Sequence, residues 1–315
     1  MKCLRDALAE YVKIRRALGS QFRWPGSALR RFVDFLDHEG AMFVTTDLAM
    51  RWATEPAGVQ RATRAARLSM VRRFATWLFV FDPRTQVPPP GLLKAHHRRN
   101  KPYIYTEQEI ESLMAEAARL PSPKGLRAQT YVTLIGLLAA TGLRPGEALA
   151  LDVCDVDIAN GILSIRETKF GKSRFVPLHE TTRVALAHYA GQRDETIRRH
   201  RTDAFLISER GTRLSSCATR RTFAKMSCAI GLRERATGRR IGRGPRLHDV
   251  RHTFATRRLI EWYRAGLDVD RELPKLATYL GHVHVAYTYW YIQAVPELLQ
   301  LAAERCAARQ AGGVR

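Results

Sequence analysis

The sequence predicts a mainly α-helical protein of two domains, with a small β-sheet in the second. Apolar residues recur at helical spacing through most of the chain, and a strand-like alternation is confined to residues 155–177. A proline-rich segment near residues 83–102 interrupts the helical pattern. A chain of 315 residues is long enough for two separate cores. We therefore expect an all-α domain at 1–85, a linker at 86–105, and a mixed α/β domain at 106–315 ending in a tail helix.

The composition indicates a polyanionic partner. Lys and Arg number 52 against 30 Asp and Glu, which gives a formal net charge of +22. No apolar run is long enough to cross a membrane and no secretory signal is visible, so we expect a cytoplasmic protein without a membrane partner. The five cysteines are scattered without a Cys-x-x-Cys pair. This spacing argues against a zinc site or a disulfide framework.

The first domain is expected to contain four helices. Apolar spacing predicts the first at about 5–18, and the second after a break at Trp24-Pro25-Gly26. A third should begin near Thr46, and a fourth should cover about 63–79. Acidic residues are nearly absent from the fourth helix, so its basic face is suited to phosphate. The arginines expected to make these contacts are Arg61, Arg64, Arg67 and Arg72.

The linker combines prolines with a basic run. Three consecutive prolines at 88–90 favour an extended chain, and a His-His-Arg-Arg-Asn-Lys run follows. We expect phosphate contacts from Arg98, Arg99 and Lys101. The adjacent histidines His96 and His97 point in different directions on most backbones, so no metal site is expected there.

The second domain begins with a capping box and a buried helix. Thr106 and Glu109 have the spacing of a capping box, and residues 129–140 are strongly apolar. Gly142 is suited to a left-handed helix end. Arg144 lies two residues further on, before another helix that includes Glu147. An arginine fixed between two helix ends is well placed to stabilise negative charge.

The alternating segment predicts a hairpin, and helices return after it. Lys169 falls at the expected turn, with Lys172 and Arg174 just beyond. Residues 233–246 form an Arg- and Gly-rich loop in which Arg240 and Arg243 are expected to contact phosphate. The last helices are expected at 181 onward, 219–230, 247–260 and 273–280, then around Tyr291, and in a tail from Pro296.

The polar residues of this domain fit chemistry on a phosphodiester. Arginine is always charged, and its planar fork matches two phosphate oxygens. A tyrosine nucleophile would conserve the broken bond as a phosphotyrosine, so ATP would not be needed. No cluster of carboxylates suited to two Mg²⁺ ions and no P-loop is visible. We therefore expect neither a metal nor another cofactor.

Four ordered motifs in residues 106–295 resemble the tyrosine recombinase family, which includes phage integrases and the Xer proteins. They are Thr-Gly-Leu-Arg-Pro-Gly-Glu at 141–147, Lys169 before Arg-Phe-Val-Pro-Leu, Leu-His-Asp-Val-Arg-His at 247–252, and Leu-Gly-His at 280–282 with Tyr291 nine residues on. The resemblance implies a two-domain C-clamp, in which an all-α core-binding domain and a mixed α/β catalytic domain grip duplex DNA. It also implies site-specific recombination, typical of mobile elements.

The resemblance also implies a role for each matching residue. Tyr291 would attack the phosphate and form a 3′-phosphotyrosyl link. His248 would act as general base and Lys169 as general acid. The groups that would contact the phosphate oxygens are Arg144, Arg251 and His282. Glu147 and His252 would support them, and a buried, hydrogen-bonded histidine is the simpler interpretation of His252.

Several alternatives remain open from the sequence. Tyr287 and Tyr289 compete with Tyr291 as nucleophile, and Lys172 competes with Lys169. The tail after Pro296 could dock on a neighbouring protomer or on its own domain. The resemblance implies double-stranded DNA with specific sites as the partner, a homo-tetramer in synapsis, and possible cooperation with a sister recombinase. A non-catalytic DNA-binding accessory protein and a type IB topoisomerase are the competing functions.

Overall fold

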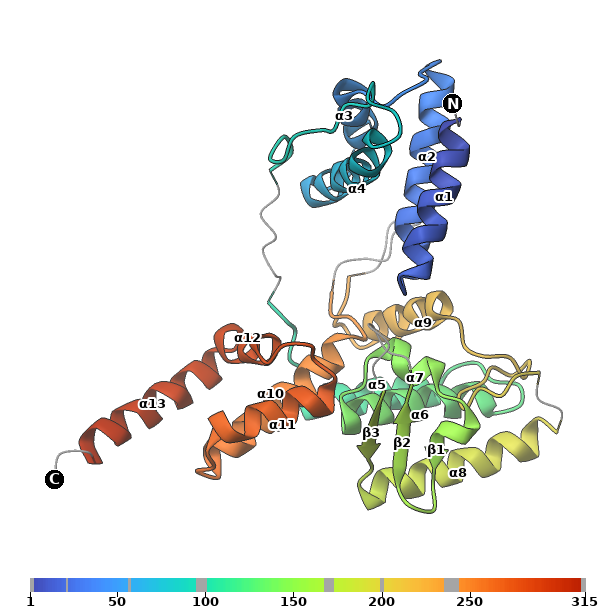
Figure 1. Ribbon diagram of the computed structural model, residues 1–315. Coiled ribbons are helices and arrows are strands. Elements are labelled where there is room, and N and C mark those ends of the chain that lie inside the picture. Colours follow the sequence, from blue (N-terminus) through green and yellow to red (C-terminus); the bar gives the residue numbers. More distant parts are fainter. Residues whose placement is uncertain are drawn as a thin grey trace. The chain divides into compact units, whose positions relative to one another are not determined.

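The chain divides into two compact units, residues 1–100 and 101–315. Figure 1 shows their helices and the one small sheet. The boundary falls within the segment for which the sequence predicts a linker. The structure, a computed structural model, describes residues 3–20, 22–55, 58–94, 101–166, 173–198, 201–234 and 244–312.

The described part of the first unit is helical. Its core is built from aromatic and aliphatic side chains such as Phe32, Leu36 and Phe74, which are fully buried. The Tyr11 ring packs on Phe74 with ring centroids 5.4 Å apart, which joins the first and last helices of the unit. The helices are α1 (Leu4–Ala17), α2 (Arg23–His38), α3 (Thr46–Thr54) and α4 (Arg61–Phe79).

Helix α2 starts earlier than the sequence predicts. The Trp-Pro-Gly run was expected to interrupt the helical pattern, but it lies in the first turn of α2, which begins at Arg23. Proline is tolerated there because the first N–H groups of a helix have no partner within the helix. The expectation of a break was therefore wrong, and Pro25 marks a helix start.

The second unit is a mixed α/β body around one core. Leu134, Ile135 and Leu138 of the apolar α6 are at most 1% exposed and lie at its centre. The helices before the sheet are α5 (Glu107–Ala118), α6 (Leu126–Thr141) and α7 (Pro145–Ala150). Those after it are α8 (Glu180–Thr196), α9 (Ser216–Ala229), α10 (Asp249–Arg264), α11 (Val269–Leu280), α12 (Ala286–Ala294) and α13 (Pro296–Gly312).

The sheet has three short antiparallel strands in the order β1-β2-β3. They are β1 (Val156–Asp157), β2 (Ile162–Ile165) and β3 (Arg174–Pro177). Leu163 pairs with Val176, and both side chains are fully buried. One face of the hairpin is thus anchored in the core, which holds Arg174 at the start of β3 in a fixed position.

A second cluster joins the last helices of this unit. Leu259 of α10, Leu273 of α11 and Leu298 of α13 are each 0% exposed and pack together with Tyr291 of α12. The first turns of α13 therefore pack on their own unit. Within the described residues, none of the helices combines the length and apolar character needed to cross a membrane.

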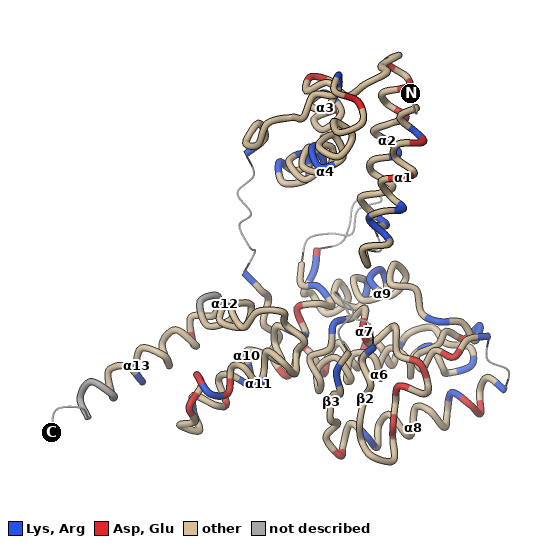
Figure 2. Tube along the Cα trace, viewed as in Figure 1, with Lys and Arg blue, Asp and Glu red and all other residues tan. Residues whose placement is uncertain are grey.

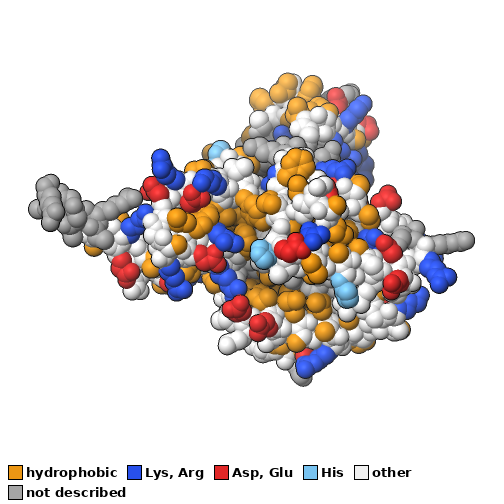
Figure 3. All heavy atoms as spheres, turned by 90° about the horizontal axis from the view of Figure 1, so that it is seen from below, with side chains coloured by type: hydrophobic (Ala, Val, Ile, Leu, Met, Phe, Trp, Pro, Cys, Tyr) orange, Lys and Arg blue, Asp and Glu red, His pale blue; other side chains and the backbone are white. Residues whose placement is uncertain are grey.

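Basic residues are concentrated on particular helices. Figure 2 shows Lys and Arg along α4 and α9, and neither helix contains Asp or Glu. On the face seen in Figure 3, charged side chains of both signs are interspersed with hydrophobic ones. The excess of positive charge is thus not spread evenly over the described surface.

Candidate active site

Arg144 stands at the junction of α6 and α7. Gly142 ends α6 in the left-handed region with φ 61°, and Pro145 is the first residue of α7. The Arg144 guanidinium donates to Glu147 Oε1 at 2.6 Å and to the Gly281 carbonyl at 3.0 Å. One third of its side chain (33%) is exposed. The guanidinium is therefore oriented by Glu147 and Gly281, and its exposed part is accessible to a ligand.

Glu147 holds a second arginine as well. Arg174 donates to the Glu147 carboxylate from both terminal nitrogens, at 3.2 and 2.8 Å. Burial raises the pKa of the Glu147 carboxyl, but hydrogen bonds and charge from Arg174 and Arg144 outweigh it and lower the pKa to about 2. Glu147 is thus ionised at any working pH and fixes two cations at once.

The position of Arg174 differs from the sequence expectation. We expected a DNA contact, but the side chain is only 11% exposed. Its Nε donates to the Tyr279 carbonyl at 2.8 Å, and its other nitrogens bind Glu147. The sequence could not reveal this use, because Glu147 and Tyr279 are distant from Arg174 along the chain.

Arg251 is the most buried cation of the site. It is 2% exposed and donates to the carbonyls of Gly142 at 2.9 Å and Leu280 at 2.5 Å. Burial, followed by the nearby charge of Arg144, lowers the pKa of Arg251 to about 10. Arg251 therefore remains a cation at neutral pH. Both acceptors lie at helix C-terminal ends, where free carbonyls favour a positive charge.

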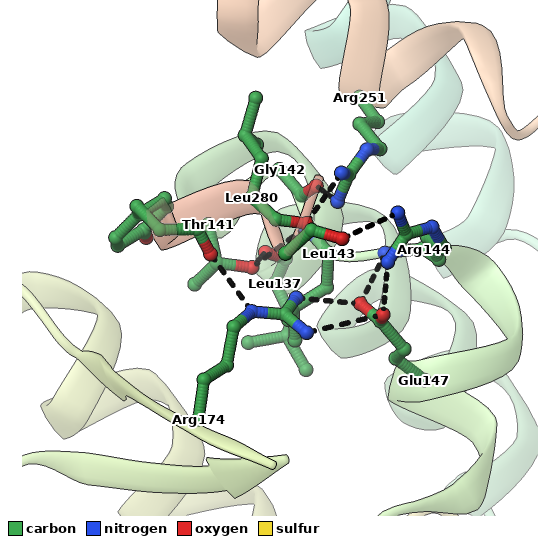
Figure 4. Close-up of polar contacts among 11 residues, drawn as sticks. Leu137, Thr141, Gly142, Leu143, Arg144, Glu147, Arg174, Arg251 and Leu280 are labelled. Carbon is green, nitrogen blue, oxygen red and sulfur yellow. Dashed lines mark hydrogen bonds and ion pairs between the residues drawn. The ribbon is translucent and has the colours of Figure 1, made fainter. Parts of the chain in front are cut away.

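Three successive carbonyls at the end of α11 each accept a hydrogen bond from a different arginine. Figure 4 shows the guanidinium groups of Arg144, Arg174 and Arg251 gathered there, with Glu147 between two of them. Gly281 is left-handed with φ 67°, and a Cβ at this position would lie 2.8 Å from an Arg174 nitrogen. The pairs are Tyr279 with Arg174, Leu280 with Arg251, and Gly281 with Arg144.

Two histidines flank Tyr291, which is 2% exposed. Its hydroxyl lies 3.1 Å from His252 Nδ1, and the His282 ring stacks on its ring with centroids 6.3 Å apart. Burial is the main cause that lowers the pKa of His252 to about 4 and that of His282 to about 3. His282 Nδ1 is fixed by Thr288 Oγ1 at 2.8 Å. Both rings are therefore neutral at pH 7.

His248 occupies a different place from His252. It lies just before α10, and burial together with the charge of Arg251 lowers its pKa. Its ring meets the His252 ring edge-on, with centroids 5.0 Å apart. His248 lines the same surface groove as Arg144, whereas His252 contacts the Tyr291 hydroxyl.

The three neighbouring tyrosines have different surroundings. Tyr287 and Tyr289 are 44% and 42% exposed, whereas Tyr291 lies among the histidines and near Arg251. Trp290, next to the tyrosine, contacts the His252 ring edge-on, with centroids 5.6 Å apart. This geometry favours Tyr291 as the residue that belongs to the arginine and histidine cluster.

Comparison with known proteins identifies the family of this chain. Residues 104–297, more than half of the chain, match the model of the phage integrase family. The chain belongs to the phage integrase family. Curated relatives include y4rB of Sinorhizobium fredii, named as an integrase/recombinase, which is 43% identical over 98% of both chains. Tyrosine recombinase XerC of Mycobacterium bovis is 30% identical over 98% of this chain and 100% of its own. The protein is thus a tyrosine recombinase.

Solved structures show that the fold is that of tyrosine recombinases. One is the integrase of the Tn1549 transposon in complex with transposon right end DNA, with a TM-score of 0.66 and 16% sequence identity. The alignment includes 97% of this chain and 100% of the integrase chain. Another is a lambda integrase dimer bound to a COC′ core site, with a TM-score of 0.57 and 19% sequence identity. The alignment includes 92% of this chain and 77% of the lambda integrase chain. The predicted fold class, mainly helical with a small sheet, is confirmed.

The recombinase has a groove of 680 Å³ beside Arg144 and His248. Its floor is apolar, with Leu149 and Phe223, and its rim is basic. The rim arginines were not among the candidates expected from the sequence, although two of them lie in the basic stretch 233–246. The rim arginines are Arg166, Arg220, Arg233 and Arg246.

The remaining basic residues expected to contact DNA fall into three groups. Arg67 and Arg72 are engaged within the protein: Arg67 stacks on Trp52 at 3.7 Å and donates to its carbonyl, and Arg72 donates to the carbonyls of Pro88 and Pro89 at 2.6 and 2.8 Å. Arg61 and Lys101 are exposed, and Arg64 is half-buried. The DNA-contact candidates outside the described residues are Lys172, Arg98, Arg99, Arg240 and Arg243. Lys169, the expected general acid, also lies outside the described residues.

Proposed function

We propose that this recombinase cuts and rejoins double-stranded DNA at specific sites through a 3′-phosphotyrosyl intermediate at Tyr291. The observation that carries the proposal is the gathering of two cations, Arg144 and Arg251, near Tyr291 and its histidines. The tyrosine oxygen would attack phosphorus and the 5′-oxygen would leave. Bond energy stays in the phosphotyrosine, so the reaction needs no ATP.

The arginines supply the charge that this reaction requires. The five-coordinate phosphorane carries an additional negative charge, and fixed cations stabilise it without having to reorganise. Arg144 and Arg251 would bind the two non-bridging oxygens. Arg144 is held beforehand by Glu147 and the Gly281 carbonyl, and Arg251 by the carbonyls of Gly142 and Leu280. His282, fixed by Thr288, would add a hydrogen bond to the phosphate. We propose no metal ion in this step.

Proton transfer is assigned to the remaining polar groups. Lys169 would donate a proton to the leaving 5′-oxygen, as the resemblance implies, with Lys172 as its competitor. His248 was expected to act as the base, but its place in the groove beside Arg144 suits contact with the phosphate instead. Glu147 would act by holding Arg144 in position.

The basic surfaces indicate where DNA would lie. The groove rim carries Arg220, Arg233 and Arg246, and residues of α4 such as Arg61 would add phosphate contacts from the helical unit. The structures of the Tn1549 and lambda integrases are complexes with transposon end DNA and with a core site. We propose that the two units close around a duplex as a C-clamp, with 1–85 as the core-binding domain, 86–105 as the linker and 106–315 as the catalytic domain.

The proposed reaction also suggests an oligomeric state and a DNA element on which the recombinase acts. Recombination joins two duplexes, so we propose a homo-tetramer in synapsis, with a sister recombinase as a possible companion. The element served would be mobile DNA, and the protein would act in the cytoplasm on nucleoid DNA. Docking of the tail from one protomer onto another would extend the contacts that the start of α13 already makes within its own chain.

A covalent-trapping assay tests the proposal. Nicked duplexes taken from DNA flanking the gene are incubated with the protein, denatured, and examined for a protein–DNA adduct, whose modified tyrosine is then mapped. We expect an adduct at Tyr291 that is abolished by Tyr291→Phe. Tyr289→Phe is the matched control, because Tyr289 is exposed and two residues away.

Other outcomes would contradict parts of the proposal. An adduct at Tyr287 or Tyr289 would retain the chemistry and refute the choice of nucleophile. Tight DNA binding without any adduct would favour an accessory DNA-binding protein. Relaxation of supercoiled DNA by monomers without a specific site would favour a type IB topoisomerase.

A further inference from the structure

His252 is a polar residue at the nucleophile to which the family resemblance gives only a supporting role. Its Nδ1 lies 3.1 Å from the Tyr291 hydroxyl oxygen, within hydrogen-bond reach. The side chain is 14% exposed, and its ring is held edge-on by Trp290 on one side and by His248 on another. The hydrogen bond is therefore made by a ring whose orientation is fixed by packing.

The state of the ring allows it to accept a proton. Burial and the neighbouring His248 lower the pKa of His252 to about 4, so the imidazole is neutral at pH 7. A neutral imidazole has one nitrogen that accepts and one that donates. The Asp249 carboxylate lies 3.9 Å from Nε2, and a negative charge there favours the proton on Nε2. Nδ1 is then the acceptor that faces the tyrosine.

A charge must also form on the tyrosine oxygen as its proton leaves. The buried Arg251 cation and the phenolate of Tyr291 attract each other, which raises the pKa of Arg251 against the effect of burial. The site thus provides a base on one side of the hydroxyl and a cation for the resulting phenolate. This is the arrangement of an activated nucleophile: a base within hydrogen-bond reach and a third group that orients the base.

We infer that His252 is the general base for Tyr291, an inference that rests on the proposed function. As the tyrosine Oη–H bond breaks, the proton moves to His252 Nδ1. The bond from Oη to phosphorus forms while the bond from phosphorus to the 5′-oxygen breaks, and that oxygen takes its proton from the general acid. In rejoining, the 5′-hydroxyl attacks phosphorus and returns its proton to the conjugate base of the general acid, while the bond from phosphorus to Oη breaks and the His252 imidazolium returns its proton to Tyr291. Protons and bonds therefore balance over the cycle.

His248 lies in a different place from the general base inferred at the Tyr291 hydroxyl. It lines the groove with Arg144, whereas the described hydrogen bond at the tyrosine hydroxyl is made by His252. The titratable and charged groups around the His252 ring are Arg246 and His248 just before α10, Asp249 and Arg251 in its first turn, Tyr291 of α12, and His282 after α11.

The test compares His252→Asn with the wild-type full-length chain on the nicked duplexes described above. The oxygen of Asn can take the place of Nδ1 and accept the same hydrogen bond, but it is not a base. We expect the single-turnover rate of adduct formation to fall about 100-fold at pH 7. The variant's rate should rise about tenfold per pH unit, because hydroxide replaces the missing base, whereas the wild-type rate stays flat from pH 6 to 8.

The controls separate the possible failures. His284→Asn removes an exposed histidine two residues from His282 and should leave the rate unchanged. Added imidazole should restore part of the rate to His252→Ala. If the wild type forms no adduct, the proposed function is wrong. If it does, and His252→Asn reacts within about threefold with an unchanged pH profile, His252 only positions the tyrosine and the inference is overturned.

Discussion

At the scale of single residues, the site depends on one shared carboxylate. Glu147 binds Arg144 and Arg174, and its pKa of about 2 reflects both cations. A buried carboxylate that loses a partner is left incompletely compensated, which costs more than the same loss at the surface. Arg174 therefore stabilises the fold and also orients Arg144 through Glu147.

Replacement of Arg174 should show both effects. We expect Arg174→Ala to lower the free energy of unfolding by about 3 kcal/mol, because it breaks a buried ion pair. Urea denaturation at pH 7 measures this change. Arg119→Ala is the control, since Arg119 is 75% exposed and pairs with Glu116 at the surface, where about 0.5 kcal/mol is expected.

The rate of adduct formation distinguishes the two roles of Arg174. If Arg174 orients Arg144, the rate falls at saturating DNA even at temperatures where the variant is fully folded. An Arg174→Ala variant that is less stable but reacts at the wild-type rate would limit Arg174 to a structural role.

At the scale of elements, helix ends build the site. The C-terminal end of α6 supplies the Gly142 carbonyl and that of α11 supplies three more. Each end is closed by a left-handed glycine, which allows the backbone to turn directly into a functional residue. Arg144 follows one of these ends and His282 follows the other.

The start of α13 is the element that secures α10 and α12. Leu298 is 0% exposed in the cluster with Leu259 and Tyr291, whereas its neighbour Leu299 is 48% exposed. We expect Leu298→Ala to lower the free energy of unfolding by about 3 kcal/mol, from lost burial and the cavity left behind. Leu299→Ala should change it by less than about 0.5 kcal/mol. Equal effects in thermal unfolding would show that α13 does not pack on its own unit.

At the scale of the whole molecule, the net charge of +22 governs association. Binding to DNA releases condensed counterions, so affinity should fall steeply with salt concentration. Arg220 of α9 is exposed and lines the groove, whereas Arg233 and Arg246 also bond to groups of the protein. We therefore expect Arg220 to contact a phosphate.

Salt titrations test this assignment. We expect Arg220→Ala to reduce the slope of log K against log salt by about 1, the contribution of one phosphate contact. Arg119→Ala, which removes the same charge from outside the groove, should leave the slope unchanged. If both substitutions alter the slope equally, the groove is not the path of the DNA.

Most of the fold was accessible from sequence periodicity. Helical spacing located α1, α4, α6 and α9 to within a few residues, and the Thr106 capping box is present at the start of α5 as predicted. The start of α2 was missed because a proline in the first turn resembles a break. Helical spacing and capping motifs predict a helix when the residues within that helix carry the pattern. They fail where one pattern, such as an early proline, is compatible with both a helix start and a break.

The sequence by itself determined the class of chemistry, because arginine, histidine and tyrosine in ordered motifs have few other uses together. Only the tertiary structure decided which of these residues contact one another. It placed Arg174 on Glu147 rather than at the surface, His252 rather than His248 at the tyrosine hydroxyl, and Arg220 on the groove rim. Such contacts join residues tens of positions apart, and only packing of the core brings them together.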